Sequence, residues 1–384
     1  MGHSSIEYLE RLIAYPTVSR DSNLDLIDFV RQELEEAGAS CSLVASEDGR
    51  KANLLSMLGP QDRPGILLSG HSDVVPVEGQ AWTGDPFRLR QENGRLYGRG
   101  TADMKGFIAC VLSLFRAAAR RRLAVPLGFA CSYDEELGCI GVRRLLDMME
   151  KMPVRPRFCI VGEPTGLQVV TAHKGKVGTK VSCKGLEAHS ALAPLAVNAV
   201  YMALDLIAEI RRVQAEIVAS DRKDGEYDVP HTTLHVGNIS GGEVINIVPN
   251  RCRFEYEIRH IPEDDPQEFS RRIEAAADKI AKEAQKIFAG AAIEFTPGAS
   301  YPAMNTPPDS EVASFMKSIT GGNSTGKISF GTEGGLFQQR LGVPTVVCGP
   351  GHIGVAHKPD EYIEASQLAQ CDEMLARLLE RVSH

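Results

Sequence analysis

Apolar runs and amphipathic segments alternate along the first part of the chain. Three nearly continuous apolar runs, which are typical of buried strands, cover residues 65–70, 127–134 and 158–163. Apolar residues recur at helical spacing in four other segments, which cover residues 5–14, 23–38, 104–122 and 138–152. Buried strands that alternate with helices predict an α/β fold with a doubly wound sheet.

The pattern changes near residue 175. Period-two alternation, typical of half-exposed strands, covers residues 176–190, 232–242, 250–262 and 291–298. Long amphipathic helices are predicted at 198–220 and 265–287. We therefore expect an α+β block at 178–297, inserted into an α/β domain that is formed by residues 1–177 and 298–384.

Composition narrows the classes of protein. Of 384 residues, 43% are hydrophobic and 24% charged, and the net charge is −8 without a basic stripe, which argues against nucleic acid as a partner. The nine scattered cysteines form no CxxC pair, which argues against a disulfide framework and a cysteine-type zinc site. Since no apolar run approaches the length of a membrane span, we expect a cytoplasmic protein without a membrane partner.

Acidic and histidine residues gather where the predicted strands end. They are His71, Asp73, Asp103, Glu135, Glu136, Glu163 and His357. In open α/β sheets, ligands bind beyond the carboxyl ends of the strands. Imidazoles and carboxylates suit zinc, cobalt or manganese, and two neighbouring metal ions need one carboxylate that bridges them. The set therefore indicates a metal centre that also holds a carboxylate base.

His71 and Asp73 lie two residues apart at the end of one predicted strand. Residues two apart on a strand face the same way, so His71 could bind a metal ion while Asp73 accepts the other ring N–H and fixes the tautomer. Taken singly, such a pair is more often a local hydrogen bond or a cap, and an acidic turn such as 134–136 is more often solvated. The co-occurrence of several such signals in one domain favours the metal site.

Five stretches resemble the M20 metallopeptidase and deacylase family: 69–76, 98–106, 133–138, 162–165 and 349–361. The sequences of several of these stretches are similar to those of the acetylornithine deacetylase branch of the family. The resemblance covers nearly the whole chain. It implies two metal ions, zinc or cobalt. His71 and Glu163 would bind one ion, Glu136 and His357 the second, and Asp103 both.

The resemblance also implies the remaining roles. Glu135 would be the general base, and Asp73 would orient His71. The inserted block would be a ferredoxin-like lid and dimerisation domain, whose His189 reaches the active site of the partner subunit. The alternative for His189 is a capping or surface histidine. A cis peptide bond is expected after Asp103.

Substrate binding is predicted at two places. In the block, Asn246 and Arg259 match positions that contact the substrate, and a guanidinium suits an α-carboxylate. Alternatively, Arg259 forms an ion pair with a nearby glutamate and Asn246 is a turn residue. In the α/β domain, the glycine-rich loop would hold the carboxylate, with Glu333 available to a cationic side chain; this loop comprises Gly331, Thr332, Glu333 and Gly334.

The implied activity is metal-dependent hydrolysis of an N-acyl amino acid by a homodimer, with N-acetylornithine, an intermediate of arginine biosynthesis, as the substrate. The alternatives within the family are a succinyl-diaminopimelate desuccinylase, an N-acylcitrulline deacylase or a dipeptidase. An inert ligand-binding member is a further alternative. A nucleotide-binding protein is disfavoured because residues 98–106 lack both GxGxxG spacing and the Lys-Ser/Thr pair of a P-loop.

Overall fold

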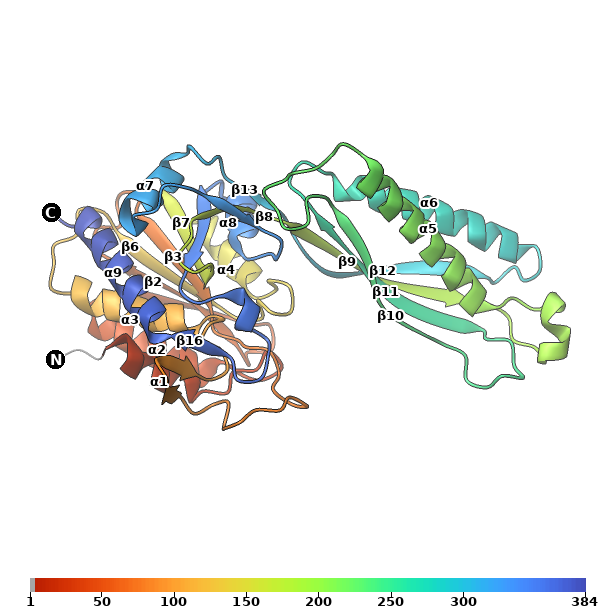
Figure 1. The fold of residues 1–384 in the computed structure, drawn as a ribbon, viewed down its shortest axis with the longest axis horizontal. Coiled ribbons are helices and arrows are strands. Elements are labelled where there is room, and N and C mark those ends of the chain that lie inside the picture. The colour runs from red at the N-terminus through yellow and green to blue at the C-terminus, as the bar shows by residue number, and fades with distance from the viewer. Residues whose placement is uncertain (1–3) are drawn as a thin grey trace. The chain divides into compact units, whose positions relative to one another are not determined.

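The computed structural model describes residues 4–384 of the chain. They form two compact units, which Figure 1 draws as ribbons. The first comprises the described residues up to His173 together with Met304–His384. The second is Lys174–Ala303, which extends a few residues beyond the predicted block on both sides. No helix within residues 4–384 is long and apolar enough to cross a membrane.

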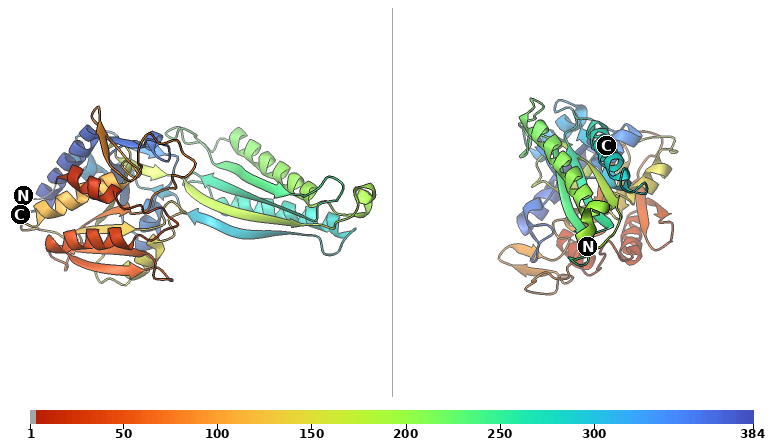
Figure 2. Two further views of the ribbon diagram at one scale, coloured as in Figure 1. Left: turned by 90° about the horizontal axis from the view of Figure 1, so that it is seen from below. Right: turned by 90° about the vertical axis from the view of Figure 1, so that its right-hand side faces the viewer.

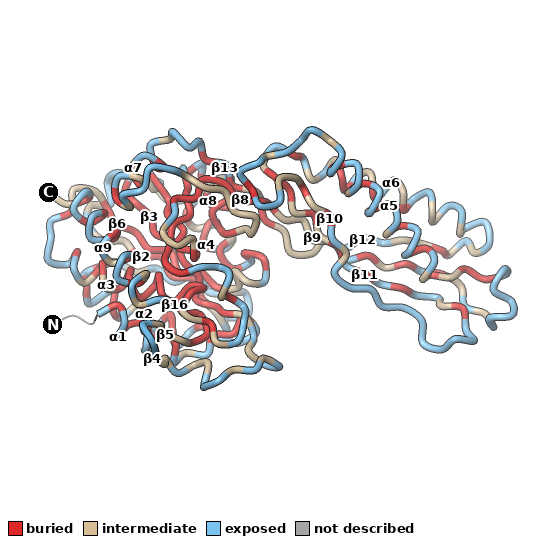
Figure 3. Tube along the Cα trace, viewed as in Figure 1, coloured by how far each residue is buried: buried red, intermediate tan, exposed pale blue. Residues whose placement is uncertain are grey.

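A nine-stranded mixed sheet is the centre of the first unit. Its order is β1 (Ser40–Ala45), β2 (Ala52–Leu58), β6 (Leu127–Ser132), β3 (Ile66–His71), β7 (Phe158–Pro164), β15 (Thr345–Gly349), β8 (Val170–His173) and β13 (Met304–Asn305), and β14 (Gly326–Ile328) pairs with β8. Strands β6, β3, β7 and β15 run parallel, so their carboxyl ends meet at one edge. Figure 3 shows these central strands as largely buried.

Helices cover the sheet. The main apolar core includes residues of α1 (Ser5–Ile13), α2 (Leu24–Glu36), α3 (Lys105–Ala118), α7 (Glu311–Thr320) and α9 (Ala365–Val382). Helix α3 is apolar on nearly all sides, which is typical of a buried helix. Helix α4 (Val142–Met149) contacts α8 (Gly334–Leu341). A small sheet of β4 (Arg90–Glu92), β5 (Arg95–Tyr97) and β16 (Tyr362–Glu364), and the short 3-10 helix η2 (Ile353–Val355), complete the unit.

Strand alternation separates the apolar and polar faces of the central strands. Leu68 on β3 and Phe129 on β6 belong to the main core. Ser69 and His71 on β3, and Ser132 on β6, are offset by an odd number of residues and therefore face the opposite side. The alternation confirms the predicted α/β class and places polar side chains on one face at the strand ends.

The second unit is ferredoxin-like. Its antiparallel sheet has the order β10 (Thr233–Gly241), β11 (Arg251–His260), β9 (Gly175–Lys184) and β12 (Ala292–Tyr301). Helices α5 (Ala199–Ala219) and α6 (Pro266–Gln285) share one apolar core with the sheet, so the chain order is βαββαβ (Figure 2). The short 3-10 helix η1 (Ser190–Leu195) precedes α5. Strand β11 alternates between buried and more exposed residues, as predicted, whereas β10 is exposed along most of its length.

Candidate metal centre

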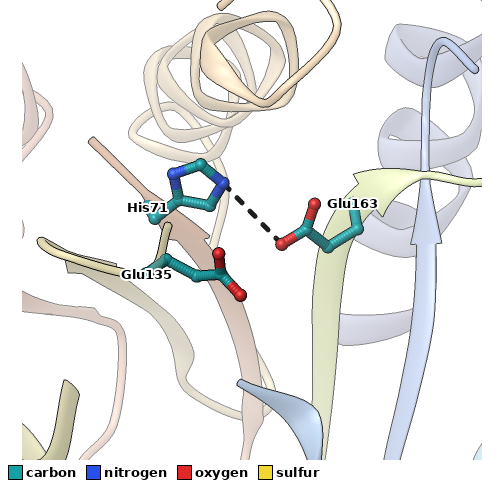
Figure 4. Close-up of side chains that lie close together, drawn as sticks. All are labelled: His71, Glu135 and Glu163. Carbon is teal, nitrogen blue, oxygen red and sulfur yellow. Dashed lines mark ion pairs between the residues drawn. The ribbon is translucent and has the colours of Figure 1, made fainter. Parts of the chain in front are cut away.

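Three parallel strands position three of the five predicted metal ligands, His71, Glu136 and Glu163. His71 is the last residue of β3, and Glu163 is the penultimate residue of β7. Glu135 and Glu136 follow the end of β6 in a short turn. Figure 4 shows the side chains of His71, Glu135 and Glu163 converging from these elements. The geometry brings together residues that are far apart in the sequence.

Asp103 lies between two imidazoles. Its Oδ1 is 3.0 Å from Nε2 of His71, and its Oδ2 is 3.3 Å from Nε2 of His357. Each oxygen of one buried carboxylate thus faces a different histidine, which is the arrangement that a bridging ligand requires. The peptide bond between Asp103 and Met104 is cis, as the resemblance implies.

The other carboxylates complete two groups around this bridge. Glu163 Oε1 is 3.7 Å from Nε2 of His71, and Glu136 Oε1 is 3.0 Å from Nε2 of His357. Donor atoms of His71, Asp103 and Glu136 all lie within 4.8 Å of one another. Donor atoms of His71, Glu135 and Glu163 also lie within 4.8 Å of one another. By distance alone, Glu135 could therefore be a metal ligand.

The charge of this cluster fits divalent cations. Burial raises the pKa of Glu163 well above its usual value and that of Glu136 to about 7. Hydrogen bonds to Asp103 and Glu136 raise the pKa of His357 to about 10. Several buried carboxylates therefore compete for a small number of protons, and bound cations would neutralise them instead. Two imidazoles with carboxylates form a donor set that suits zinc or cobalt.

Asp73 supports both His71 and the acidic turn. Nδ1 of His71 lies 2.9 Å from the main-chain oxygen of Asp73 and 3.5 Å from its Oδ1. The nearer of the two acceptors is the peptide oxygen, and both belong to Asp73, the residue predicted to accept this ring N–H. The Asp73 carboxylate accepts the N–H of Glu135 at 3.1 Å, the N–H of Glu136 at 3.4 Å and the hydroxyl of Ser19 at 2.7 Å. Asp73 thus orients the turn as well as the histidine.

Glu135 is held close to the ligands. Burial raises the pKa of its carboxyl well above its usual value, and the neighbouring charge of His71 opposes that rise. The thiol of Cys139 donates to Glu135 Oε1 at 3.3 Å. A carboxyl group with a raised pKa, beside this cluster of imidazoles and carboxylates, is suited to take up and return a proton.

The loop at 331–334 differs from its prediction in one respect. Glu333 is buried, and its carboxylate accepts hydrogen bonds from the hydroxyls of Ser132 at 2.5 Å and Ser69 at 3.4 Å. Burial raises the pKa of Glu333 to about 7. Its neighbour Thr332 accepts the N–H of Gly334 at 3.0 Å. The structure thus gives the Glu333 carboxylate two serine partners that the sequence did not predict.

His189, Asn246 and Arg259 lie in the second unit. His189 caps η1 by accepting the N–H of Ala191 at 3.1 Å, so the capping alternative describes its local contact. The main-chain oxygen of Asn246 accepts the N–H of Ser190 at 2.9 Å, which brings Asn246 beside His189.

Arg259 on β11 has two partners. It donates to Glu257 at 2.9 Å and to the hydroxyl of Tyr301 at 2.5 Å. The ion pair that the sequence suggested as an alternative for Arg259 is therefore present.

Known proteins resemble this chain over nearly its full length. The model of the peptidase family M20/M25/M40 matches residues 67–381. Acetylornithine deacetylase of Myxococcus xanthus is 36% identical over 374 residues, 96% of this chain and 95% of that protein. Acetylornithine deacetylase of Shigella sonnei (strain Ss046) is 31% identical over 381 residues, 97% of this chain and 96% of that protein. The M20 family metallo-carboxypeptidase Sso-CP2 from Sulfolobus solfataricus shares the fold, with a TM-score of 0.78, 19% identity and 99% of both chains covered.

Proposed function

Because the chain belongs to the peptidase family M20/M25/M40, a family of hydrolases, we propose that it is a metal-dependent amidohydrolase that deacylates N-acyl amino acids. The preferred substrate is N-acetylornithine, which would yield ornithine and acetate in arginine biosynthesis; the two acetylornithine deacetylases support this choice. The observation that carries the proposal is the Asp103 carboxylate, which faces His71 with one oxygen and His357 with the other.

Five side chains would hold two zinc or cobalt ions. His71 and Glu163 form one position, Glu136 and His357 the other, and Asp103 bridges them. When bound, the ions would polarise the acyl carbonyl and lower the pKa of a water molecule toward about 7. The buried, mutually repelling carboxylates support this assignment, because they need cations to remain charged.

Glu135 would act as the general base. Its carboxylate takes a proton from the attacking water and returns it to the leaving amine. Two observations support this role: its backbone is fixed by the Asp73 carboxylate, and its side chain converges on His71. Asp73 is a positioning residue in this scheme.

The second unit would bind the substrate. Arg259 and Asn246 would hold the α-carboxylate, together with main-chain groups of residues 331–334, because a guanidinium forms paired hydrogen bonds with a carboxylate. Glu333 is left out of this set, since its carboxylate is buried against Ser69 and Ser132.

The second unit would also join two copies of the chain. On α5, the exposed residues Tyr201, Leu204, Ala208, Arg211, Ala215 and Val218 recur at alternating spacings of three and four. Tyr201 is 66% and Leu204 50% exposed, on the side of the helix away from the core of the unit. Residues at this spacing form a stripe along a helix against which a second helix can pack. Helix α5 of another copy of the chain would be that second helix.

Leu204→Glu tests this interface. A charge on this stripe should convert the dimer to a monomer, measured by light scattering after size-exclusion chromatography, because a buried glutamate would lack a partner. Glu209→Gln, on the same helix, is the control and should remain dimeric. A wild-type monomer, or an unchanged dimer in Leu204→Glu, would contradict this interface.

We propose that His189 helps to stabilise the oxyanion that forms when water attacks the acyl carbon. His189→Ala should therefore lower kcat by about 10²- to 10³-fold, the usual effect of removing one oxyanion donor. Metal content should stay unchanged, because His189 lies in the other unit. If His189 acts on the partner subunit, a mixed dimer of His189→Ala and Glu135→Ala chains should regain activity. No recovery in confirmed mixed dimers would disprove action between subunits.

A substrate panel tests the proposed function. Metal-reconstituted protein would be assayed with N-acetylornithine, N-acetylcitrulline, N-succinyl-diaminopimelate and a dipeptide. We expect the highest kcat/KM for N-acetylornithine and loss of activity after chelation. Preference for another compound would replace the substrate but keep the mechanism. No turnover by protein that has bound two ions would indicate an inert member of the family.

A further inference from the structure

A buried ion pair lies behind the bridging aspartate. Arg99 donates from Nη1 to Glu361 Oε2 at 2.6 Å, and each of the two side chains is 1% exposed. The other oxygen of Glu361 accepts the N–H groups of Ala102 at 2.9 Å and of Asp103 at 3.1 Å. The Glu361 carboxylate thus fixes the backbone that carries Asp103, although neither Arg99 nor Glu361 belongs to the proposed ligands.

Gln80 extends this network to the backbone of His357. Its Oε1 accepts hydrogen bonds from Arg99 Nη2 at 2.6 Å and from Trp82 Nε1 at 3.0 Å. Its Nε2 donates to the main-chain oxygen of His357 at 2.9 Å. One amide therefore connects the peptide of His357, through Arg99 and Glu361, to the peptide of Asp103.

The two histidines of the centre are supported in different ways. His71 is buried at the end of a central strand and is held by the pairing of that strand. His357 follows η2 in a loop, its backbone has φ 62°, and its side chain is 49% exposed. The nearby loop at residues 80–83 holds this segment at two points, since Thr83 also donates to Asp360 from its main-chain N–H at 3.1 Å and its hydroxyl at 2.9 Å.

We propose that Gln80 is a positioning residue that fixes His357 relative to Asp103 and thereby strengthens binding of the metal ion at the His357 and Glu136 position. This inference rests on the proposed function, because it assumes the metal centre. Hydrogen bonds to the surroundings of a ligand reduce its freedom before the ion arrives, and losing such a partner typically lowers metal affinity by about 10- to 100-fold.

Gln80→Ala tests the proposal by metal titration. Metal-free wild type and variant would be titrated with zinc in competition with a chromophoric chelator, which gives an affinity for each ion without an activity assay. We expect one of the two affinities to fall by about 10-fold and the other to stay unchanged. Gln91→Ala, which alters an exposed glutamine on β4, is the matched control and should bind both ions like wild type.

A second background identifies the affected position. The His357→Ala variant lacks the ligand that Gln80 supports. Adding Gln80→Ala to it should leave the affinity for the remaining zinc ion unchanged. Three results would overturn the proposal: an equal loss of affinity for both ions in Gln80→Ala, unchanged affinities in Gln80→Ala, or a further loss of affinity when Gln80→Ala is added to His357→Ala. The metal-free Gln80→Ala protein should fold like wild type, and its melting temperature should fall by only a few degrees, because the buried Arg99 Nη2 loses one acceptor. Wild-type protein that binds no zinc would overturn the proposed function itself.

Discussion

Glu135→Gln is expected to lower kcat by about 10²- to 10⁴-fold while both metal ions stay bound, because an amide of nearly the same shape cannot accept the proton of the attacking water. The main-chain N–H of residue 135 would still donate to Asp73, so the turn should keep its conformation. Turnover of N-acetylornithine and metal content by elemental analysis would be measured on the same preparation.

Loss of a metal ion in this variant would exchange the proposed roles of Glu135 and Glu136 as base and ligand. Donor atoms of Glu135, His71 and Glu163 lie within 4.8 Å of one another, so Glu135 is also within reach of a metal ion. Loss of an ion in Glu135→Gln would make Glu135 a ligand. Glu136→Gln is the matched comparison from the same turn, and it should lose an ion because Glu136 faces His357 at 3.0 Å.

Asp103→Asn is expected to lower the affinity for both metal ions by more than about 100-fold and to abolish hydrolysis. This loss exceeds the usual effect of removing a residue that only supports a ligand. One carboxylate oxygen would become an amide NH₂, which cannot bind a cation, and the bridge would lose its negative charge. Zinc titration would measure both affinities. Asp62→Asn, an exposed aspartate in the same unit, is the control. Retention of one ion at the wild-type affinity would show that Asp103 binds only a single ion.

The α/β class and the gathering of acidic and histidine side chains at the strand ends could be predicted from sequence because both depend on local patterns. His71, the acidic turn at 135–136 and Glu163 each follow an apolar run, and parallel strands bring such positions to one edge. The βαββαβ order of the second unit likewise follows from the change of period near residue 175. These features require only the period and order of the elements.

The supporting contacts could not be predicted in this way. The hydrogen bond from Gln80 to the oxygen of His357 joins residues separated by 277 positions, and that from Ser132 to Glu333 spans 201. Spacing reveals which residues share a face of one strand, but it does not reveal which distant side chain packs against that face. Glu361 lies in a stretch that resembles the family, yet only its contacts reveal that it holds the backbone of Asp103.

The most direct measurement follows hydrolysis of N-acetylornithine while metal-free protein is titrated with zinc, with bound metal determined at each point. We expect no hydrolysis above the uncatalysed rate without metal, and a rate that reaches its plateau when two ions are bound per chain. Full activity in metal-free protein, or no hydrolysis of any N-acyl amino acid by protein with two bound ions, would contradict this expectation.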